Sequence, residues 1–353
     1  MLDGVRVLDF TQYLPGPYAT QRLADLGAEV IKVEPPHGDP ARHMAGGLVY
    51  EANNRSKESI AIDLKDEMKV NELIELIQTA DVVIESFRPG VMKRIGLHYE
   101  RIKQVKEDII YCSLTGFGQE GPLAHLGSHD LNYQGLGGLL SQYCDGNGKP
   151  VQPTFTTVDY AGGIVASEKI AAALFQRERT GKGCFLDLAL NDAVVSMLGT
   201  HAAYEVEKGK RDGPNFIDGH VVCYGLYETK DHRFVSLAAL EPHFWNNFCQ
   251  GVGRREWLPH AFSKSDGDIH KEIIALFKDR TMAEWTSFGE QHDCCLFPVL
   301  EVREVIGHAY GSARGLVKKE DERVHILTTP GTKVKTSPQL GEHNDRMTRD
   351  FRA

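Results

Sequence analysis

The sequence lacks long apolar runs and paired cysteines. No run approaches the roughly 18–20 apolar residues that a membrane helix needs. Residues 1–6 have no apolar core of a signal peptide. The seven cysteines are an odd number, and no two have Cys-x-x-Cys spacing. A disulfide framework and a zinc site are therefore not expected, and we predict a cytoplasmic protein with no membrane contact.

The chain also lacks an excess of positive charge. Its formal net charge is −9, from 40 Lys and Arg against 49 Asp and Glu. A nucleic-acid partner is not expected, because no Lys/Arg-rich block of the required length is present. An anionic small ligand would need a local basic cluster that works against the overall field.

What the sequence does contain is an alternation of strand and helix signals. At roughly 100–200 residues per domain, 353 residues predict two domains. Strands are predicted over 5–10, 28–34, 81–85, 109–114 and 184–188, with helix-length segments between them. A long helix is predicted over 159–179 and a further helix over 191–206. This pattern predicts an α/β fold with a parallel sheet and helices on both faces.

The opening βαβ unit, with Glu34 ending its second strand, invites a dinucleotide-binding interpretation. Its loop supplies only Gly16, between Pro15 and Pro17. Each proline lacks an N–H group, so the loop is a poor cradle for phosphate. A structural βαβ unit is the better interpretation, and no NAD or FAD is predicted.

Two clusters in the sequence contain side chains that could act as acids or bases. A glycine-rich loop over 116–122 leads to His129 and Asp130 at a predicted helix start, and Asp159 opens the long helix beside Gly162 and Gly163. Open α/β sheets build their sites at the carboxyl ends of their strands. Spacing alone also allows a purely structural interpretation, and even favours it. In that interpretation both aspartates cap helices and His129 is a surface residue.

At these residues the sequence resembles the family III CoA-transferases (CaiB/BaiF type), most closely their α-methylacyl-CoA racemase branch. The resemblance rests on residues 2–10 (LDGVRVLDF), 25–34 (DLGAEVIKVE), 38–40 (GDP), 54–65 (NRSKESIAIDLK), 87–90 (FRPG) and 115–119 (TGFGQ). It covers nearly the whole chain.

The resemblance implies a Rossmann-like large domain that binds CoA and is completed by both chain ends. We therefore expect this domain over 1–206, a linker over 207–219, and a small α+β domain over 220–300 that begins with a hairpin signature. Residues 301–353 are expected to return to the large domain. An interlocked homodimer is implied, with active sites that use both subunits. CoA would be part of the substrate, with no metal and no permanently bound cofactor.

The resemblance also implies the catalytic residues. A racemase needs two acid/base groups that flank the α-carbon of the thioester, which here are His129 and Asp159. Glu241 would orient His129, and Asp130 would support Asp159 or the helix start. Backbone amides near residues 159–162 are expected to stabilise the enolate oxygen.

The alternative activity is CoA transfer, in which Asp159 is a nucleophile that forms an acyl-enzyme and then a thioester. Three features favour the racemase of a 2-methylacyl-CoA. His129 stands where oxalate-type transferases tend to carry Tyr, Leu14 replaces a glutamine of theirs, and residues 239–245 (ALEPHFW) match the racemase pattern. A non-enzymatic CoA-binding role is a third reading.

The CoA site is predicted, by resemblance, around two arginines that suit phosphate, Arg88 and Arg94. The other residues expected there are Ile62, Asp63, Leu64, Lys65, Ser86, Phe87, Pro89, Gly90, Ser128 and Tyr133. Arg55 and Lys57 are expected to add positive charge. Pro35 replaces an arginine of some relatives, and Arg42 or His37 would then compensate.

Overall fold

The computed structural model describes residues 1–145, 147–209, 214, 216–320 and 323–346, and it divides into two compact units. Unit 1 contains residues 1–198 and the described residues from 309 onward, and unit 2 contains residues 199–308. The predicted domain boundary after residue 206 falls inside helix α9 (Gly199–Lys208), which belongs to unit 2. The predicted linker over 207–219 includes residues 210–213 and 215, which lie outside the described ranges.

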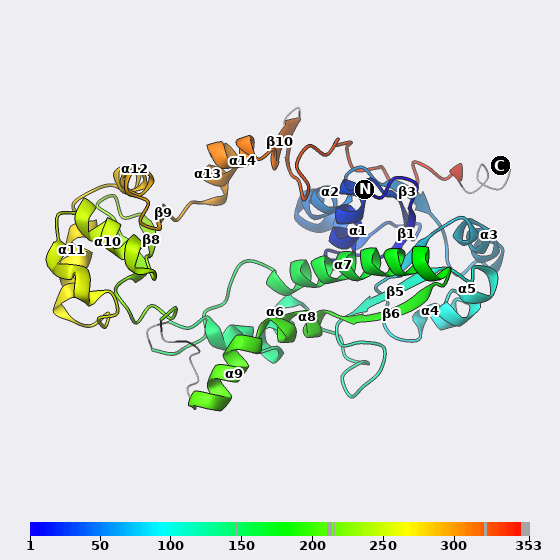
Figure 1. Cartoon of the computed structure of the whole chain (residues 1–353). Helices are drawn as coiled ribbons and strands as arrows, with labels where there is room; N and C mark the ends of the chain where they lie inside the picture. The colour runs from blue at the N-terminus through cyan, green and yellow to red at the C-terminus, as the bar shows by residue number, and fades with distance from the viewer. Residues whose placement is uncertain (146, 210–213, 215, 321–322, 347–353) are drawn as a thin grey trace. The chain divides into compact units, whose positions relative to one another are not determined.

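Unit 1 is built on a six-stranded parallel sheet in the order β3-β2-β1-β4-β5-β6 (Figure 1). The strands are β1 (Arg6–Phe10), β2 (Glu29–Glu34), β3 (Glu58–Ala61), β4 (Val82–Glu85), β5 (Ile110–Thr115) and β6 (Cys184–Ala189). The predicted parallel sheet is confirmed. The strand order reverses between β1 and β4, where open α/β sheets form a binding crevice.

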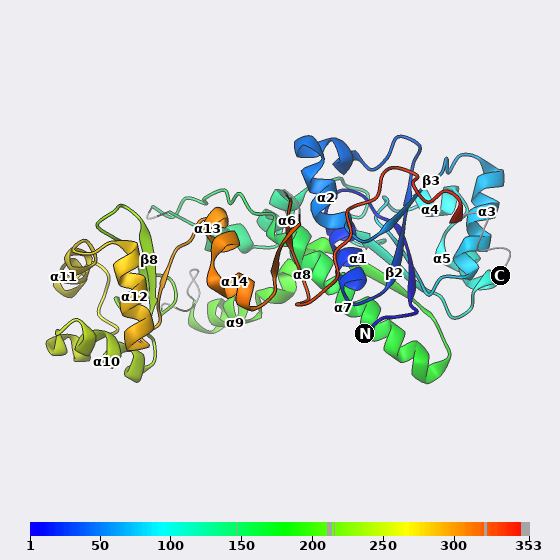
Figure 2. The same cartoon turned by 90° about the horizontal axis from the view of Figure 1, so that it is seen from above.

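Helices cover both faces of this sheet (Figure 2). On one face α1 (Pro15–Asp25), α7 (Thr157–Thr180) and α8 (Leu190–Met197) share an apolar core with β1, β4 and β5. On the other face α3 (Glu67–Gln78) and α5 (Tyr99–Val105) do the same. Helix α1 begins with a proline, which needs no N–H partner there. The carboxylate of Asp66 caps α3 by accepting two backbone N–H groups.

Several short helices lie in the loops at the carboxyl edge of the sheet. They are a 3₁₀ helix (Pro40–Gly47), α2 (Leu48–Asn54), α4 (Val91–Arg94), α6 (Asp130–Leu136) and a second 3₁₀ helix (Leu139–Gln142). The single helix expected over 191–206 is a wrong prediction. The chain breaks at Leu198 into α8 and α9, which belong to different units.

The C-terminal part of the chain returns to unit 1 and completes it. After α13 (Val302–Gly307) in unit 2 come α14 (Ala309–Ala313) and the antiparallel pair β10 (Val317–Glu320) and β11 (Arg323–Ile326). Further on, the His343 N–H donates to the Ser59 carbonyl (2.9 Å), and the Ala61 N–H donates to Asn344 Oδ1 (2.8 Å). These bonds cover the edge strand β3, which would otherwise offer unpaired backbone groups.

Unit 2 combines a three-stranded antiparallel sheet with helices. The predicted hairpin is confirmed as β7 (Tyr224–Glu228) and β8 (Phe234–Ala238), and β9 (Leu296–Pro298) pairs with β8. Around them lie α10 (Pro242–Gly251), a 3₁₀ helix (Arg255–His260), α11 (Asp268–Phe277) and α12 (Met282–His292). The core contains three buried tryptophans, Trp245, Trp257 and Trp285. Unit 2 therefore has a hydrophobic core of its own.

Within the described residues, no helix combines the length and the apolar character needed to cross a bilayer.

Candidate active site

His129 stands at the N-terminal boundary of α6. Its backbone is extended (φ −131°, ψ 171°), and its backbone N–H donates to Asn132 Oδ1 at 3.0 Å. The residue is exposed. An imidazole in this position is available to a ligand.

Asp130 joins α6 to the long helix α7. It is buried, and its Oδ1 accepts the backbone N–H groups of Val158 (2.7 Å) and Asp159 (3.0 Å). Thr156, the residue before α7, makes no side-chain capping bond, so Asp130 caps this helix from another element. The cap brings the backbone of Asp159 next to the residue that follows His129.

Asp159 is half-buried in the first turn of α7. Burial, together with the negative charge of Asp130, raises the pKa of Asp159 to about 7. None of the ion pairs found among the described residues includes it. A carboxyl group with such a pKa exists in both protonation states near neutral pH, as an acid/base group requires.

Helix α1 packs closely against the start of α7. A Cβ atom added at Gly163 would lie 2.8 Å from the Pro15 carbonyl oxygen, so only glycine allows this approach. Tyr160, the residue after Asp159, meets the Tyr18 ring edge-on (4.8 Å) and stacks on Phe155 (5.1 Å). Tyr160, which follows Asp159 in the chain, is therefore held between aromatic side chains of α1 and of the loop before α7.

The loop before α1 is held in a strained shape. Tyr13 has a left-handed backbone (φ 67°), which non-glycine residues rarely adopt. Its N–H donates to Asp39 Oδ1 (3.1 Å), and the N–H of Gln12 donates to Ser86 Oγ (3.1 Å). Fixed contacts thus determine the conformation of the segment that also contains Leu14.

The amides expected to stabilise an enolate oxygen at the start of α7 are already in use. Asp130 accepts the N–H groups of Val158 and Asp159, and the Tyr160 N–H donates to the Thr156 carbonyl (3.3 Å). Of the amides expected over 159–162, those of Asp159 and Tyr160 therefore already donate to Asp130 and to the Thr156 carbonyl, and neither is free for an enolate oxygen.

A basic cavity of about 420 Å³ lies at the carboxyl ends of β4 and β5. It is lined by Arg88, Pro89, Val91, Arg94, Gln119, Glu120, Gly121, Ala124 and His125. Both arginines are exposed, and the Arg88 guanidinium packs so closely on Gly127 that a Cβ atom there would collide with it. Gly127 precedes His129 by two residues, so the basic cavity lies close to the start of α6.

Apart from Arg88, Pro89 and Arg94, the residues predicted to bind CoA do not line this cavity. Ser86, Phe87 and Gly90 belong to the same loop as Arg88, and Gly90 starts α4 with a left-handed backbone (φ 84°). Tyr133 is buried against Phe117 (5.5 Å between ring centroids) and donates to the Ser128 carbonyl (3.4 Å).

The predicted residues Ile62, Asp63, Leu64 and Lys65 follow β3. The Ile62 N–H donates to the Glu34 carbonyl (2.8 Å), and the Lys65 N–H donates to Asp63 Oδ1 (3.0 Å). Leu64 packs on the apolar core, whereas Asp63 and Lys65 are exposed. The structure therefore separates this group from the cavity with the two arginines.

Three further cations proposed from the sequence are engaged inside unit 1. Lys57 Nζ pairs with Asp9 Oδ2 (3.1 Å), and Arg55 pairs with Asp25 (2.5 Å). Both cations are at least 96% buried, so the expectation that they add charge to a CoA pocket is wrong. Arg42, expected to compensate for Pro35, pairs with Glu34 (2.7 Å).

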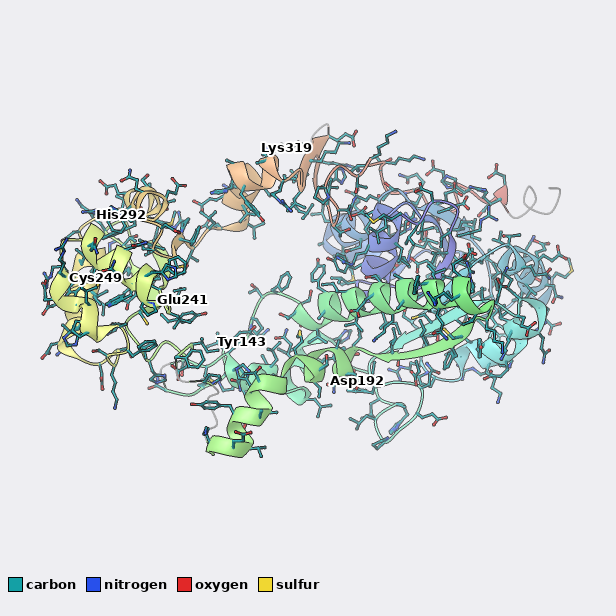
Figure 3. The ribbon with its side chains drawn as sticks, in the orientation of Figure 1. Tyr143, Asp192, Glu241, Cys249, His292 and Lys319 are labelled. Carbon is teal, nitrogen blue, oxygen red and sulfur yellow. The ribbon has the colours of Figure 1, made fainter. Side chains whose placement is uncertain are left out.

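Glu241 belongs to the second unit, where it precedes α10 (Figure 3). Burial and the charge of Glu241 raise the pKa of the Cys295 thiol, so these two side chains are neighbours. His129 belongs to unit 1.

Sequence reasoning missed two carboxylates in unit 1. Glu85 ends β4 and is 97% buried, and burial raises its pKa to about 7. Asp187 lies on β6, where its carboxylate accepts the Gln119 N–H (3.0 Å to Oδ1). A charged residue at or near the end of an apolar strand was the available signal. Throughout the described ranges, no group of three or more His, Cys, Asp or Glu residues has the arrangement of a metal site.

Comparison with known proteins gives consistent matches over the full length. The sequence pattern of CoA-transferase family III matches residues 2–344. The chain is 32% identical to the α-methylacyl-CoA racemase of Homo sapiens over 366 residues, which covers 99% of this chain and 93% of that protein. It is 39% identical to the succinate–glutarate CoA-transferase of Agrobacterium fabrum over 380 residues, which covers 98% and 94%.

A solved structure has the same fold. The crystal structure of a CAIB/BAIF family protein from Brucella suis superposes with a TM-score of 0.86 at 28% identity, and the match covers 99% of both chains. The names of the relatives that match in sequence divide between a racemase and CoA-transferases.

Proposed function

Because the chain belongs to CoA-transferase family III and is thus an enzyme that acts on acyl-CoA thioesters, we propose that it is an acyl-CoA racemase. It inverts the α-carbon of a 2-methylacyl-CoA by removing a proton from one face and returning one to the other. The two groups that exchange protons with the substrate are His129 and Asp159.

The reaction proceeds through an enolate. The His129 imidazole takes the α-proton of one epimer, and the electrons of the broken C–H bond move to the thioester carbonyl oxygen. The protonated Asp159 carboxyl group then donates its proton to the opposite face of the carbon. The reverse direction starts from the Asp159 carboxylate and the imidazolium, so each group needs both protonation states.

The raised pKa of Asp159 is the observation that carries this proposal. At about 7, the carboxyl group is protonated in a substantial fraction of molecules near neutral pH. A carboxylate nucleophile acts only in its charged form, for which a raised pKa is a disadvantage. Proton donation to an enolate uses the neutral form, which burial favours.

The basic cavity is the proposed site for the phosphate groups of CoA. Arg88 and Arg94 present guanidinium groups to it, and these bind phosphate by paired hydrogen bonds. The contact between Arg88 and Gly127 puts this cavity near His129. CoA enters as part of the substrate and leaves with the product, and no resident cofactor is proposed.

We further propose that the active form is the interlocked homodimer implied by the resemblance, in which Glu241 of one chain orients His129 of the other. A carboxylate that accepts one imidazole N–H fixes the tautomer and stabilises the imidazolium. Size-exclusion chromatography with light scattering should give twice the mass of 39.3 kDa. A monomeric enzyme with full activity would contradict the dimer.

The second candidate function is transfer of CoA between carboxylic acids. The match of 39% identity to a succinate–glutarate CoA-transferase supports it, since that relative shares nearly the full length of this chain. In that reaction Asp159 attacks the thioester carbonyl, which releases CoA thiolate and leaves an acyl anhydride on the enzyme.

One experiment separates the two reactions. The enzyme is incubated in D₂O with (2R)- and with (2S)-2-methylacyl-CoA, without any acceptor acid, and the α-hydrogen is followed by NMR. The racemase proposal predicts deuterium at the α-carbon of both epimers together with the appearance of the opposite epimer. Activity that appears only after a carboxylic acid is added, with no α-deuteration, would overturn the proposal and establish the transferase.

A further inference from the structure

Glu85, Ser113 and Asp187 form a row across three neighbouring strands at the carboxyl edge of the sheet. Glu85 of β4 is in register with Ser113 of β5, which is in register with Asp187 of β6. Residues in register on adjacent parallel strands point to the same face, so their side chains lie side by side. A hydrogen bond from Ser113 to Glu85 connects the first two.

Each carboxylate of this row fixes a different loop. Glu85 Oε2 accepts the N–H of Phe87 at 2.7 Å and so holds the turn that presents Arg88. Asp187 accepts the N–H of Gln119 at 3.0 Å and 3.1 Å, and this holds the loop where Gly118 has a left-handed backbone (φ 84°). These two loops supply seven of the nine residues that line the basic cavity, and Val91 and Arg94 of α4 supply the other two.

We propose that Glu85 and Asp187 are positioning residues for CoA: they hold the two loops of the basic cavity at the separation at which Arg88 and Arg94 receive its phosphate groups. The identity of this ligand rests on the proposed function. Neither carboxylate touches the reacting carbon, so their loss changes the binding of CoA and leaves the chemical step in place.

The protonation of Glu85 makes the cavity sensitive to pH. Burial is the main cause of its pKa of about 7, and the charge of Asp187, which is exposed, acts in the same direction. The other titratable groups that interact with Glu85 are Tyr111 and Cys112 of β5, and their own pKa values are raised, so both stay neutral. Above pH 7 Glu85 becomes negatively charged, two residues before Phe87 and three before Arg88. This negative charge repels the phosphate groups of CoA.

Three variants test this with CoA itself as the probe in calorimetry. In Glu85→Gln the amide oxygen still accepts the Phe87 N–H, but the side chain never ionises. We expect wild-type affinity at pH 6 and about 3–10-fold tighter binding than wild type at pH 8. Because the phosphates of CoA titrate identically with both proteins, the difference between the two pH profiles isolates Glu85.

Glu85→Leu removes the acceptor. We expect the Kd for CoA at pH 6 to rise about tenfold, while kcat for α-proton exchange stays within about threefold of the wild-type value. At pH 6 Glu85→Gln should bind CoA more tightly than Glu85→Leu, because the conservative variant keeps the acceptor for the Phe87 N–H.

In Asp187→Ala, loss of the Gln119 acceptor is expected to raise the Kd about threefold, because this group is exposed to water.

Asp81→Asn is the matched control. Asp81 lies at the opposite, amino end of β4, where it accepts the Arg6 N–H at 2.7 Å and pairs with Arg177. The change is expected to lower stability but to leave the Kd for CoA within about twofold of wild type.

The outcomes separate this inference from the proposed function. A wild-type protein that binds no CoA, or exchanges no α-proton, would contradict the function. A wild-type protein that binds CoA, together with a Glu85→Gln variant whose pH profile is the same as wild type, would overturn the inference. So would a loss of affinity in Asp81→Asn as large as in Glu85→Leu, because the effect would then be general destabilisation.

Discussion

The two halves of the sheet's carboxyl edge differ in whether their buried carboxylates are paired with cations. In the half formed by β1–β3, each buried carboxylate pairs with a cation: Asp9 with Lys57, Asp39 with Lys32, and Glu34 with Arg42. Although burial opposes it, the charges of Lys32 and Lys57 hold the pKa of Asp9 far below its usual range. Hydrogen bonds from Arg42 and Ser59 likewise lower the pKa of Glu34.

In the half formed by β4–β6 and the helices α6 and α7, buried carboxylates have no such partner among the described residues. Glu85 and Asp159 both have pKa values raised to about 7 by burial and by a neighbouring aspartate. The comparison shows how one sheet supports two tasks. Paired carboxylates fix the backbone, and unpaired ones keep a proton available near neutral pH.

The largest expected effect comes from removing the acid/base group of the unpaired half. Asp159→Asn keeps the shape of the side chain but transfers no proton. The rate of α-deuterium exchange should fall about 10²–10⁴-fold, the range that general acid–base catalysis supplies. Asp66→Asn is the control, since Asp66 only caps α3, and its exchange rate should equal that of the wild type. An Asp159→Asn variant with more than half the wild-type rate would remove Asp159 from the mechanism.

The next largest effect is expected in the paired half, where removing a cation should lower the free energy of unfolding. Lys57→Met leaves Asp9 buried beside Lys32 without its second cation, and breaks three further hydrogen bonds, to Pro17, Thr20 and Asn54. Breaking a buried pair costs about 3–5 kcal/mol. Urea denaturation at pH 6 measures it, because burial lowers the pKa of Lys57 to about 7 and the pair is charged below that pH. Lys69→Met, which breaks an exposed pair, should leave the midpoint unchanged.

If the Lys57→Met variant unfolds at the wild-type urea concentration, the paired half does not have the structural role described here. Folded Lys57→Met protein should retain α-proton exchange, since Lys57 does not reach the substrate. A variant of normal stability that has lost all exchange would instead assign catalysis to the paired half.

The smallest effect is expected where the two halves meet. Gly163 of α7 faces α1, and a Cβ atom there would lie 2.8 Å from the Pro15 carbonyl oxygen and 2.9 Å from the Tyr18 ring. Gly163→Ala should therefore cost about 1–3 kcal/mol through overpacking. Gly199→Ala, at a position with nothing within 4 Å, is the control for thermal unfolding. Equal melting temperatures for both variants would show that the α1–α7 contact adapts freely.

The sequence was sufficient to predict five of the six strands of the parallel sheet, whereas the acid/base role of His129 and Asp159 stays a prediction. Apolar runs such as residues 81–85 are local, and they became β4. His129 and Asp159 were found from glycine-rich neighbourhoods and from the resemblance. Strand β3 went unpredicted because it has only four residues, and two of them are Glu58 and Ser59.

What the sequence did not provide are properties that arise between distant segments. The Asp130 cap joins residues 28 and 29 positions apart, and the Lys57–Asp9 bond spans 48 positions. Lys57 was expected to add charge to a CoA site because its burial depends on strands and a helix that only the fold assembles. The titration of Glu85 depends on burial in the same way, so no local pattern reports it.

The most direct test of the account is the titration of Asp159 itself. The ¹³C-carboxyl signals of aspartate-labelled protein are followed from pH 4 to pH 9, and the Asp159→Asn spectrum assigns the signal of interest by its absence. A resonance with a midpoint near pH 7, set by burial and by Asp130, is expected. A midpoint at or below about 4, the ordinary value for aspartate, would show that Asp159 holds no proton at neutral pH and would contradict its role as the acid.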